Sequence, residues 1–285
     1  MPIGRGNNLE PESDAVTFQF DTDGYLTDGP DMPAIGIGKA YGSLLGRARQ
    51  INREAHELLF SAEIHNRDPQ EILTSALFVR SLEQYQATMI LLGTGLVAPA
   101  KVTLRATLES VFTIRAVAAH NDALIAFINA DLIQRRKMVR RAQQYDDHVN
   151  LRDLREALSS DFVADLDKKI ISSGAKSLKT EDLSKLAGMH EWYTTIYALL
   201  SQATHTNVRE LDSYLSTDKN ENIIELQYAP SLAQIPKLTV TAIHCIILAA
   251  EAMAVVFELD FHKLRGHLGF VKATSDSLDE DVSLN

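Results

Sequence analysis

The sequence contains a single cysteine, Cys245, so no disulfide can form within the chain. One thiol also cannot build a zinc site by itself, because such sites use several protein ligands. The first fourteen residues, MPIGRGNNLEPESD, lack the continuous apolar stretch of a secretory signal. We therefore expect a protein that works in a reducing compartment, the cytoplasm.

Helix breakers are also scarce. The 285 residues include only 8 prolines and 14 glycines, and these cluster near the front of the chain. A hydrophobic fraction of 45% and a charged fraction of 23% are typical of a globular protein. The net charge of −10 argues against general non-specific DNA binding, which requires many cations that neutralise phosphates. A local basic site remains compatible with this charge.

Several familiar motifs are missing. The sequence has no GxxxxGK[ST] loop and no GxGxxG after an expected strand, the commonest nucleotide-binding loops. It has no HExxH and no Glu-x-x-His pair, which argues against a zinc protease and a ferritin-like di-iron site. Gly-x-Ser-x-Gly, the hydrolase elbow, is absent too. We predict no metal site and no cofactor.

Apolar residues recur at helical spacing from Ile37 onward, which predicts a mainly α protein folded as a multi-helix up-and-down bundle. Asp68 and Pro69 have the residue types of an N-cap and a first helical position. The expected helices cover residues 40–66, 69–97, 99–120, 123–145, 150–172, 180–189, 192–215 and a long segment that ends near 261.

The two ends of the chain are polar, and they set the expected domain limits. Residues 1–36 predict an arm with a β-hairpin, because Ala15–Phe20 alternates before Asp23-Gly24. Ile223–Tyr228 is a plausible partner strand after the polar turn Asp218–Asn222, giving a small β accessory. We assign 37–272 to one helical domain, with a charged helical arm at about 123–190, and 273–285 to a disordered acidic tail.

Leu238–Leu259 is about long enough to span a bilayer. Glu251 lies near its middle, and a central carboxylate costs about 3 kcal/mol on membrane-insertion scales. We therefore predict a helix buried in the protein core and no membrane association. A membrane-anchored protein is the alternative, and it rests on this segment alone.

Trp192–Leu215 is the stretch with the most chemical promise. As one helix it has an apolar side with Trp192, Ile196 and Leu199. A second row carries Tyr197, Ser201 and His205, and Arg209 continues the line of Ser201 and His205. A hydroxyl, an imidazole and a guanidinium on one ridge are unusual for a packing surface.

Arg105 and Glu109 lie four residues apart on the apolar row of another expected helix. If this helix packs against the Ser201–His205 helix, Arg, Glu and His line one cleft. Histidine transfers protons near neutral pH, and arginine holds phosphates. Such a site can cleave RNA through the ribose 2′-hydroxyl without a metal. Alternatively, Arg105 and Glu109 form a buried ion pair that fixes helix register, and His205 is a structural hydrogen-bonding residue.

The expected helix 123–145 carries a basic run in its second half. Arg135, Arg136, Arg140 and Arg141 share a broad face. An ordinary solvated helix face explains such a run. A contact surface for phosphate or RNA is the sharper interpretation, favoured because the rest of the chain is acidic.

Two segments, LRATLESVF (Leu104–Phe112) and YALLSQATHTNVREL (Tyr197–Leu211), resemble blocks of an uncharacterised bacterial all-helical family. That family combines an Arg-x-x-x-Glu helix with a later Leu-Ser-x-x-x-His helix, and the resemblance spans roughly residues 73–215. The pattern is distantly similar to HEPN domains, helical bundles that include metal-independent ribonucleases of toxin and phage-defence systems. Those ribonucleases place Arg before His on one helix, whereas here Arg209 follows His205.

The resemblance implies a HEPN-like protein that acts on RNA or a nucleotide in defence or stress, as a homo-oligomer with a composite site. His205 would be the acid or base, Arg105 and Arg209 phosphate contacts, and Glu109 an orienting partner, with Ser201 beside them. The alternative function is a non-catalytic helical module that binds a partner protein or a small ligand.

Overall fold

The computed structural model describes residues 3–4, 23–29, 31–144, 160–204, 208–220, 222–228 and 232–283. The long helices are α1 (Met32–Phe60), α2 (Pro69–Gly93), α3 (Val97–Ala119), α4 (Asn121–Gln144), α6 (Ser160–Ser173), α11 (Ile235–Phe257) and α13 (Leu268–Ser283). The short helical turns are η1 (Gly24–Leu26), α7 (Thr180–Leu186), α8 (His190–Trp192), η3 (Tyr193–Tyr197), α9 (Ala198–Thr204), α10 (Val208–Leu211), η4 (Asp212–Tyr214), η5 (Leu232–Gln234) and α12 (His262–Gly266). The predicted mainly α class is confirmed.

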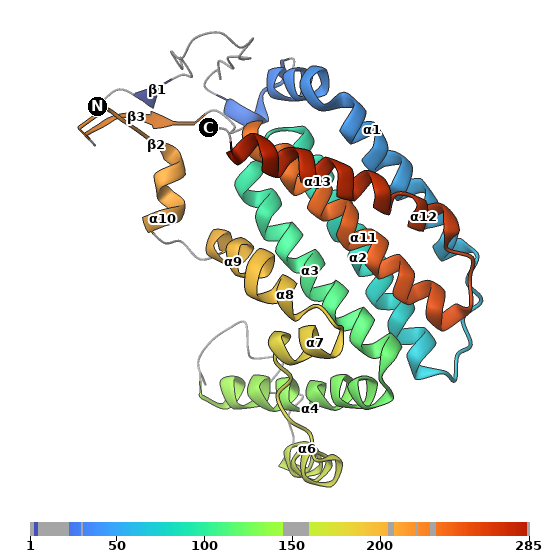
Figure 1. Ribbon diagram of the computed structural model, residues 1–285. Helices are drawn as coiled ribbons and strands as arrows, with labels where there is room; N and C mark the ends of the chain where they lie inside the picture. Colours follow the sequence, from blue (N-terminus) through green and yellow to red (C-terminus); the bar gives the residue numbers. More distant parts are fainter. Residues whose placement is uncertain are drawn as a thin grey trace.

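The core of the bundle forms around α11. This helix packs against α1, α2, α3 and α13, and α3 also packs along α2 (Figure 1). By length and composition α11 is the one helix in the described part of the chain that could cross a membrane. Its buried side chains face several sides of the bundle, among them Ile243, Ile246 and Met253. The prediction of a core helix over this segment is confirmed.

The start of α2 follows directly from local sequence. Asp68 has an extended backbone, and its carboxylate accepts hydrogen bonds from the backbone N–H groups of Gln70 and Glu71. Pro69 occupies the first helical position, where a missing N–H has no cost. This N-cap is the one predicted from the sequence.

A three-stranded sheet lies at one end of the bundle, with β1 (Ile3–Gly4), β2 (Leu215–Thr217) and β3 (Ile223–Gln227) in the order β1-β3-β2. β1 pairs with β3 in parallel and β2 pairs with it antiparallel. The polar turn Asp218–Asn222 joins the latter two, and the Asp218 backbone N–H donates to the Asn222 carbonyl over 2.9 Å. The expected strand near 223–228 is present. The predicted hairpin around Ala15–Phe20 lies outside the described residues.

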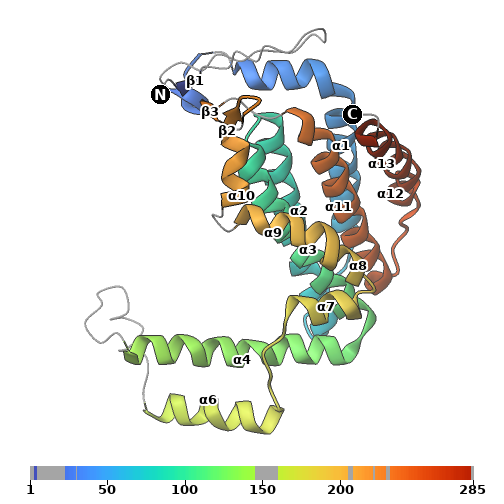
Figure 2. The same ribbon diagram turned by 60° about the vertical axis from the view of Figure 1, so that its left-hand side comes forward.

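α4 and α6 lie side by side as an arm that projects from the bundle (Figure 2). The Arg136 guanidinium binds the Asp167 carboxylate with two hydrogen bonds, of 2.6 and 3.1 Å, and so ties the two helices together. Leu166 is buried within the arm. Figure 2 shows the arm on the side of the bundle on which α9 and α10 also lie.

The expected disordered tail is wrong over the described residues, because α13 extends to Ser283. Val271 is buried, and Leu268 and Leu278 pack against the main core. Lys272 and Asp276 form a pair of 2.7 Å one helical turn apart. The acidic composition of this segment indicated disorder, although the segment also carries a short apolar stripe.

The expected single helix over 192–215 is also wrong, because it is broken into η3, α9, α10, η4 and β2. η3 is a π-turn of five residues, Tyr193–Tyr197. Within it the hydroxyls of Thr194 and Thr195 donate to the Glu191 carbonyl, at 3.0 and 2.7 Å. Threonine side chains that bond to the preceding turn compete with regular helix geometry.

One prediction concerns the carboxylate in α11. Glu251 accepts a hydrogen bond from Arg115 Nη1 over 2.5 Å, and Arg115 Nε has no partner in the described structure. Replacing Glu251 with alanine leaves a half-buried guanidinium without its acceptor. We expect the free energy of unfolding to fall by about 1.5–3 kcal/mol, measured by urea denaturation. The control is Asp279→Ala, which removes the exposed partner of Lys237 and should change stability by less than about 1 kcal/mol. Equal effects of the two substitutions would contradict a structural role for the Arg115–Glu251 pair.

Candidate functional site

α3 and α9 lie against each other, and this contact brings three of the sequence-predicted site residues together. Arg105 Nε donates to the Ser201 hydroxyl over 3.1 Å. Arg105 Nη2 lies 3.0 Å from Glu109 Oε1, one turn further along α3. The structure therefore joins Arg105, Glu109 and Ser201 in one cluster.

Tyr197 completes this cluster, although no role was predicted for it from the sequence. Its hydroxyl accepts a hydrogen bond from Arg105 Nη2 over 2.7 Å and donates one to Glu109 Oε1 over 2.7 Å. Its ring also lies under the guanidinium, with 4.9 Å between Arg105 Cζ and the ring centre. Tyr197 stands four residues before Ser201, so the spacing along the ridge was the available signal.

The π-turn η3 decides which side chains of this segment face α3. A π-turn holds one more residue than an α-turn, so every side chain after it is rotated around the axis. Leu199, expected on the apolar side, is 67% exposed, whereas Tyr197 is only 9% exposed. Tyr193 stacks on Tyr197 with ring centres 5.1 Å apart. The ridge expected to carry polar chemistry is therefore the one that packs on α3.

The cluster lies at the rim of the bundle, where water can reach it. The Arg105 side chain is 23% exposed, so it is accessible yet held by three partners. Burial raises the pKa of Tyr197 above its ordinary value; the hydrogen bond to Glu109 adds to the rise and Arg105 opposes it. Tyr197 is thus protonated at neutral pH and holds the Glu109 carboxylate in place. Chemically, the arrangement presents a fixed cation beside a serine hydroxyl.

His205, the expected acid or base, lies outside the described residues. It follows Thr204, the last residue of α9, in the sequence. Arg209 belongs to α10, and its side chain lies outside the described part of the structure. These two expected contributions to the site therefore stay predictions.

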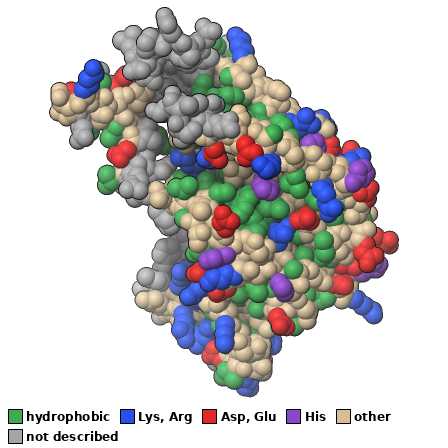
Figure 3. Space-filling view, in the orientation of Figure 1, with side chains coloured by type: hydrophobic (Ala, Val, Ile, Leu, Met, Phe, Trp, Pro, Cys, Tyr) green, Lys and Arg blue, Asp and Glu red, His purple; other side chains and the backbone are tan. Residues whose placement is uncertain are grey.

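The basic residues of α4 fall into two groups. Arg135 pairs with Asp131, and Arg136 pairs with Asp167, so an acid compensates each charge. Arg140 and Arg141 are exposed and have no acidic partner among the described residues. Figure 3 shows lysine and arginine side chains gathered over the lower part of the molecule, where α4 and α6 lie. The free positive charge of this helix is thus concentrated near its C-terminal end.

Cys245 is not a reactive group, and the described residues form no metal-binding cluster. Cys245 is fully buried in α11, and burial raises the pKa of its thiol to about 12, so it is no nucleophile at neutral pH. In the part of the chain that the structure describes, no group of three His, Cys, Asp or Glu side chains could hold a metal ion.

Tyr197→Phe tests the cluster through its pH dependence. An unfolded tyrosine loses its proton near pH 10, whereas the raised pKa keeps the proton on folded Tyr197. The stability that this group contributes is therefore complete below about pH 10 and is lost as the pH rises through the folded pKa. We expect Tyr197→Phe to lower stability by about 1–2 kcal/mol at pH 7 and to flatten the alkaline loss of stability.

Urea denaturation between pH 7 and pH 11 measures both effects. Tyr193→Phe is the matched control, because the Tyr193 hydroxyl has no hydrogen bond within the described structure. If Tyr197→Phe and Tyr193→Phe gave the same stability and the same alkaline profile, the hydrogen bonds of Tyr197 would make no measurable contribution to stability.

Comparison with known proteins gives one match. The model of a protein family of unknown function, DUF5677, matches residues 71–223, which include the α3 and α9 cluster. No curated protein and no solved structure matches the chain. The matched range agrees with the resemblance to an uncharacterised family over roughly residues 73–215. The chain belongs to the DUF5677 family, a family of unknown function.

Proposed function

We propose that this protein binds RNA or a nucleotide by its phosphates at the rim between α3 and α9, and cleaves RNA there without a metal. The observation that carries the proposal is the geometry of Arg105. Its Nε and Nη2 are engaged by Ser201, Tyr197 and Glu109, while Nη1 makes no hydrogen bond within the described structure. Nη1 is therefore a donor held in a fixed place at an accessible edge.

A positioned guanidinium is well suited to stabilise the charge that develops on a phosphate during cleavage. Because three partners hold Arg105, little side-chain freedom is lost when an anion binds. Ser201 supplies a hydroxyl at the same point. In this proposal His205 takes the proton of the 2′-hydroxyl, and the 2′-oxygen attacks the adjacent phosphorus to form a 2′,3′-cyclic phosphate. The bond from phosphorus to the 5′-oxygen breaks, and the 5′-oxygen takes a proton from water.

The arm would supply the RNA-binding surface. Arg140 and Arg141 are exposed residues near the C-terminal end of α4, without an acidic partner among the described residues. α4 projects from the side of the bundle that also carries α9 (Figure 2). An RNA strand bound there through its phosphates would be recognised without regard to its base sequence. The proposal includes a homo-oligomer in which a second subunit completes the site, as the expected resemblance to HEPN ribonucleases would imply. It also includes a cytoplasmic location, as the single cysteine would imply.

A second function is supported by a different feature of the same cluster. The side chains of Arg105, Glu109 and Tyr197 satisfy one another's hydrogen-bonding groups. Such mutual bonds are typical of residues that fix the packing of two helices. In a non-catalytic module that binds a partner protein or a small ligand, Arg105→Ala would cost about 1.5–3 kcal/mol of stability. Wild-type stability of this variant would contradict the purely structural role.

The catalytic proposal predicts the outcome for His205→Ala. Loss of the acid–base group should lower the rate of RNA cleavage by about 10²–10⁴-fold with little change in Tm. The assay follows cleavage of a fluorescently labelled single-stranded RNA in the presence of EDTA. His262→Ala, which removes an exposed histidine in α12, is the control and should cleave as the wild type does. A large fall in Tm with unchanged cleavage would overturn the assignment of His205.

The binding surface predicts a separate result. The double variant Arg140→Gln/Arg141→Gln should bind single-stranded RNA more weakly, and the dependence of log K on log[salt] should become shallower by about 1–2. Fluorescence anisotropy at several salt concentrations measures this slope. Lys263→Gln/Lys272→Gln removes the same charge from α12 and α13 and should leave the slope unchanged. Equal slopes for both double variants would rule out a specific role for α4.

A further inference from the structure

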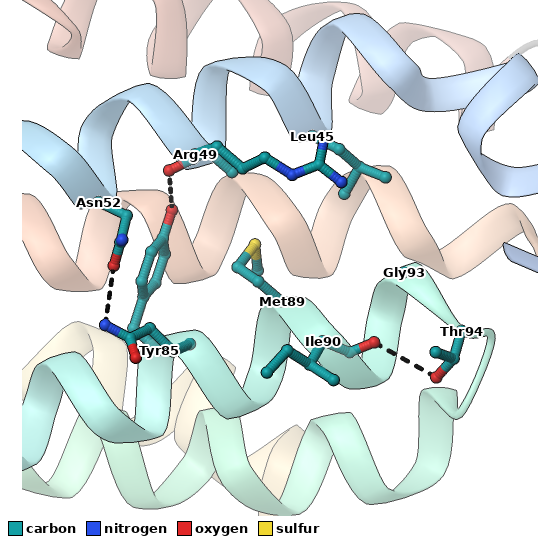
Figure 4. Close-up of a pocket in the computed structure, with 10 residues that line it drawn as sticks. Leu45, Arg49, Asn52, Tyr85, Met89, Ile90, Gly93 and Thr94 are labelled. Carbon is teal, nitrogen blue, oxygen red and sulfur yellow. Dashed lines mark hydrogen bonds between the residues drawn. The ribbon is translucent and has the colours of Figure 1, made fainter.

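A groove lies between α1 and α2, on elements that the proposed RNA site does not use. It has a volume of about 430 Å³, within the range of about 300–1,000 Å³ that is typical of small-molecule sites. Figure 4 shows its lining side chains, which come from the middle of α1 and the C-terminal half of α2. The groove is partly open to solvent.

The floor of the groove is apolar. Leu45, Ala48 and the ring of Tyr85 are buried beneath it, and Met89 lies at its centre (Figure 4). The Tyr85 hydroxyl donates to the Ala48 carbonyl over 2.9 Å, so it is already engaged. Ile90 borders the groove and is 66% exposed, which is high for a large aliphatic side chain. A hydrophobic body placed here would remove this surface from water.

One cation lies over this floor. In Figure 4 the Arg49 side chain extends along the groove toward Leu45. Arg49 has no hydrogen bond or ion pair within the described part of the chain, and no carboxylate is among the described residues that line the groove. A guanidinium beside apolar surface, with no acid to neutralise it, complements an anion that carries a hydrophobic body.

The other end of the groove is neutral and polar. Gln86 Nε2 donates to Asn52 Oδ1 over 3.2 Å and lies 3.2 Å from His56 Nε2. His56 Nδ1 lies 2.7 Å from the Asn52 carbonyl, which fixes the imidazole. Within the described structure these bonds leave the Asn52 amide N–H groups and the Gln86 amide oxygen free. This end can therefore offer both a donor and an acceptor to a ligand.

We infer that the groove binds a small organic anion with a hydrophobic body, such as an aliphatic or aromatic carboxylate. The acidic group pairs with Arg49, the body lies over Met89 and against Ile90, and the Asn52–Gln86 end receives a polar substituent. This inference is independent of the proposed RNA chemistry, because no residue is shared between the two sites.

Substitution of a glycine allows the groove to be filled without disruption of the fold. Gly93, the last residue of α2, lines the groove, and a Cβ built there meets no atom within 4 Å. Gly93→Leu would therefore fill the groove, and leucine favours a helix more than glycine does. Gly269→Leu is the matched control, since Gly269 is an equally open helical glycine on α13 and does not line the groove.

The experiment titrates the full-length protein with 8-anilinonaphthalene-1-sulfonate, a fluorescent aromatic anion. We expect saturable binding that is lost in Gly93→Leu and kept in Gly269→Leu. Arg49→Gln should weaken binding about tenfold or more, because a charged hydrogen bond is removed, whereas Arg53→Gln on the same helix should not. No saturable binding to the wild type, or equal binding by Gly93→Leu and Gly269→Leu, would overturn the site.

Competition with matched ligands tests the charge requirement. Decanoate should displace the fluorescent probe at least about tenfold more effectively than decanol, which has the same chain without the charge. Equal displacement by the two would overturn the assignment of an anion, and the groove would then be a purely hydrophobic site.

Discussion

The fold depends on burial of one apolar helix. α11 has apolar side chains around most of its circumference, so a single partner helix cannot cover it. α1, α2, α3 and α13 provide that cover together. α3 in turn is buried along much of its length, because α2 and α11 cover one side and α7 and α9 the other. Charged residues of α3 can therefore lie only along the narrow borders between these neighbours.

Two arginines of α3 use those borders in different ways. Arg115 reaches Glu251 of α11, which explains how a carboxylate is tolerated within an otherwise apolar helix. Arg105 reaches Ser201 and Tyr197 on the opposite neighbour. Both pairs join segments far apart in the sequence, so they specify how helices dock. The two arginines differ in their partners, because Arg105 binds two hydroxyl groups as well as a carboxylate, whereas Arg115 binds the Glu251 carboxylate in the described structure. A fixed cation beside a serine hydroxyl makes the Arg105 cluster the better candidate for ligand chemistry.

Helical periodicity, helix-capping residues and turn residues predicted the elements whose structure depends mainly on the local sequence. α2 begins where Asp68 and Pro69 place it, and β3 follows the turn at Asp218. The π-turn at Tyr193–Tyr197 could not be predicted from spacing, because an extra residue in one turn shifts the phase of all later positions. The contact between Arg105 and Ser201 was only a conditional expectation, since one sequence does not show which helices pack together. Tyr197 was missed because an aromatic side chain at helical spacing is typical of core packing.

Arg105 and Tyr197 do not change their protonation near neutral pH, so they can position a substrate but do not transfer protons there. Arginine stays charged in proteins, and the raised pKa of Tyr197 keeps its hydroxyl protonated far above neutral pH. The hydrogen bonds that Arg105 makes to Tyr197 and Ser201 therefore keep the same donors and acceptors across neutral pH. Any activity that changes between pH 5 and 8 must take its pH dependence from another group, and a histidine is the residue type whose ordinary pKa lies there. A pH–rate profile thus reports on the proton-transfer group alone, while the Arg105 network sets only the geometry.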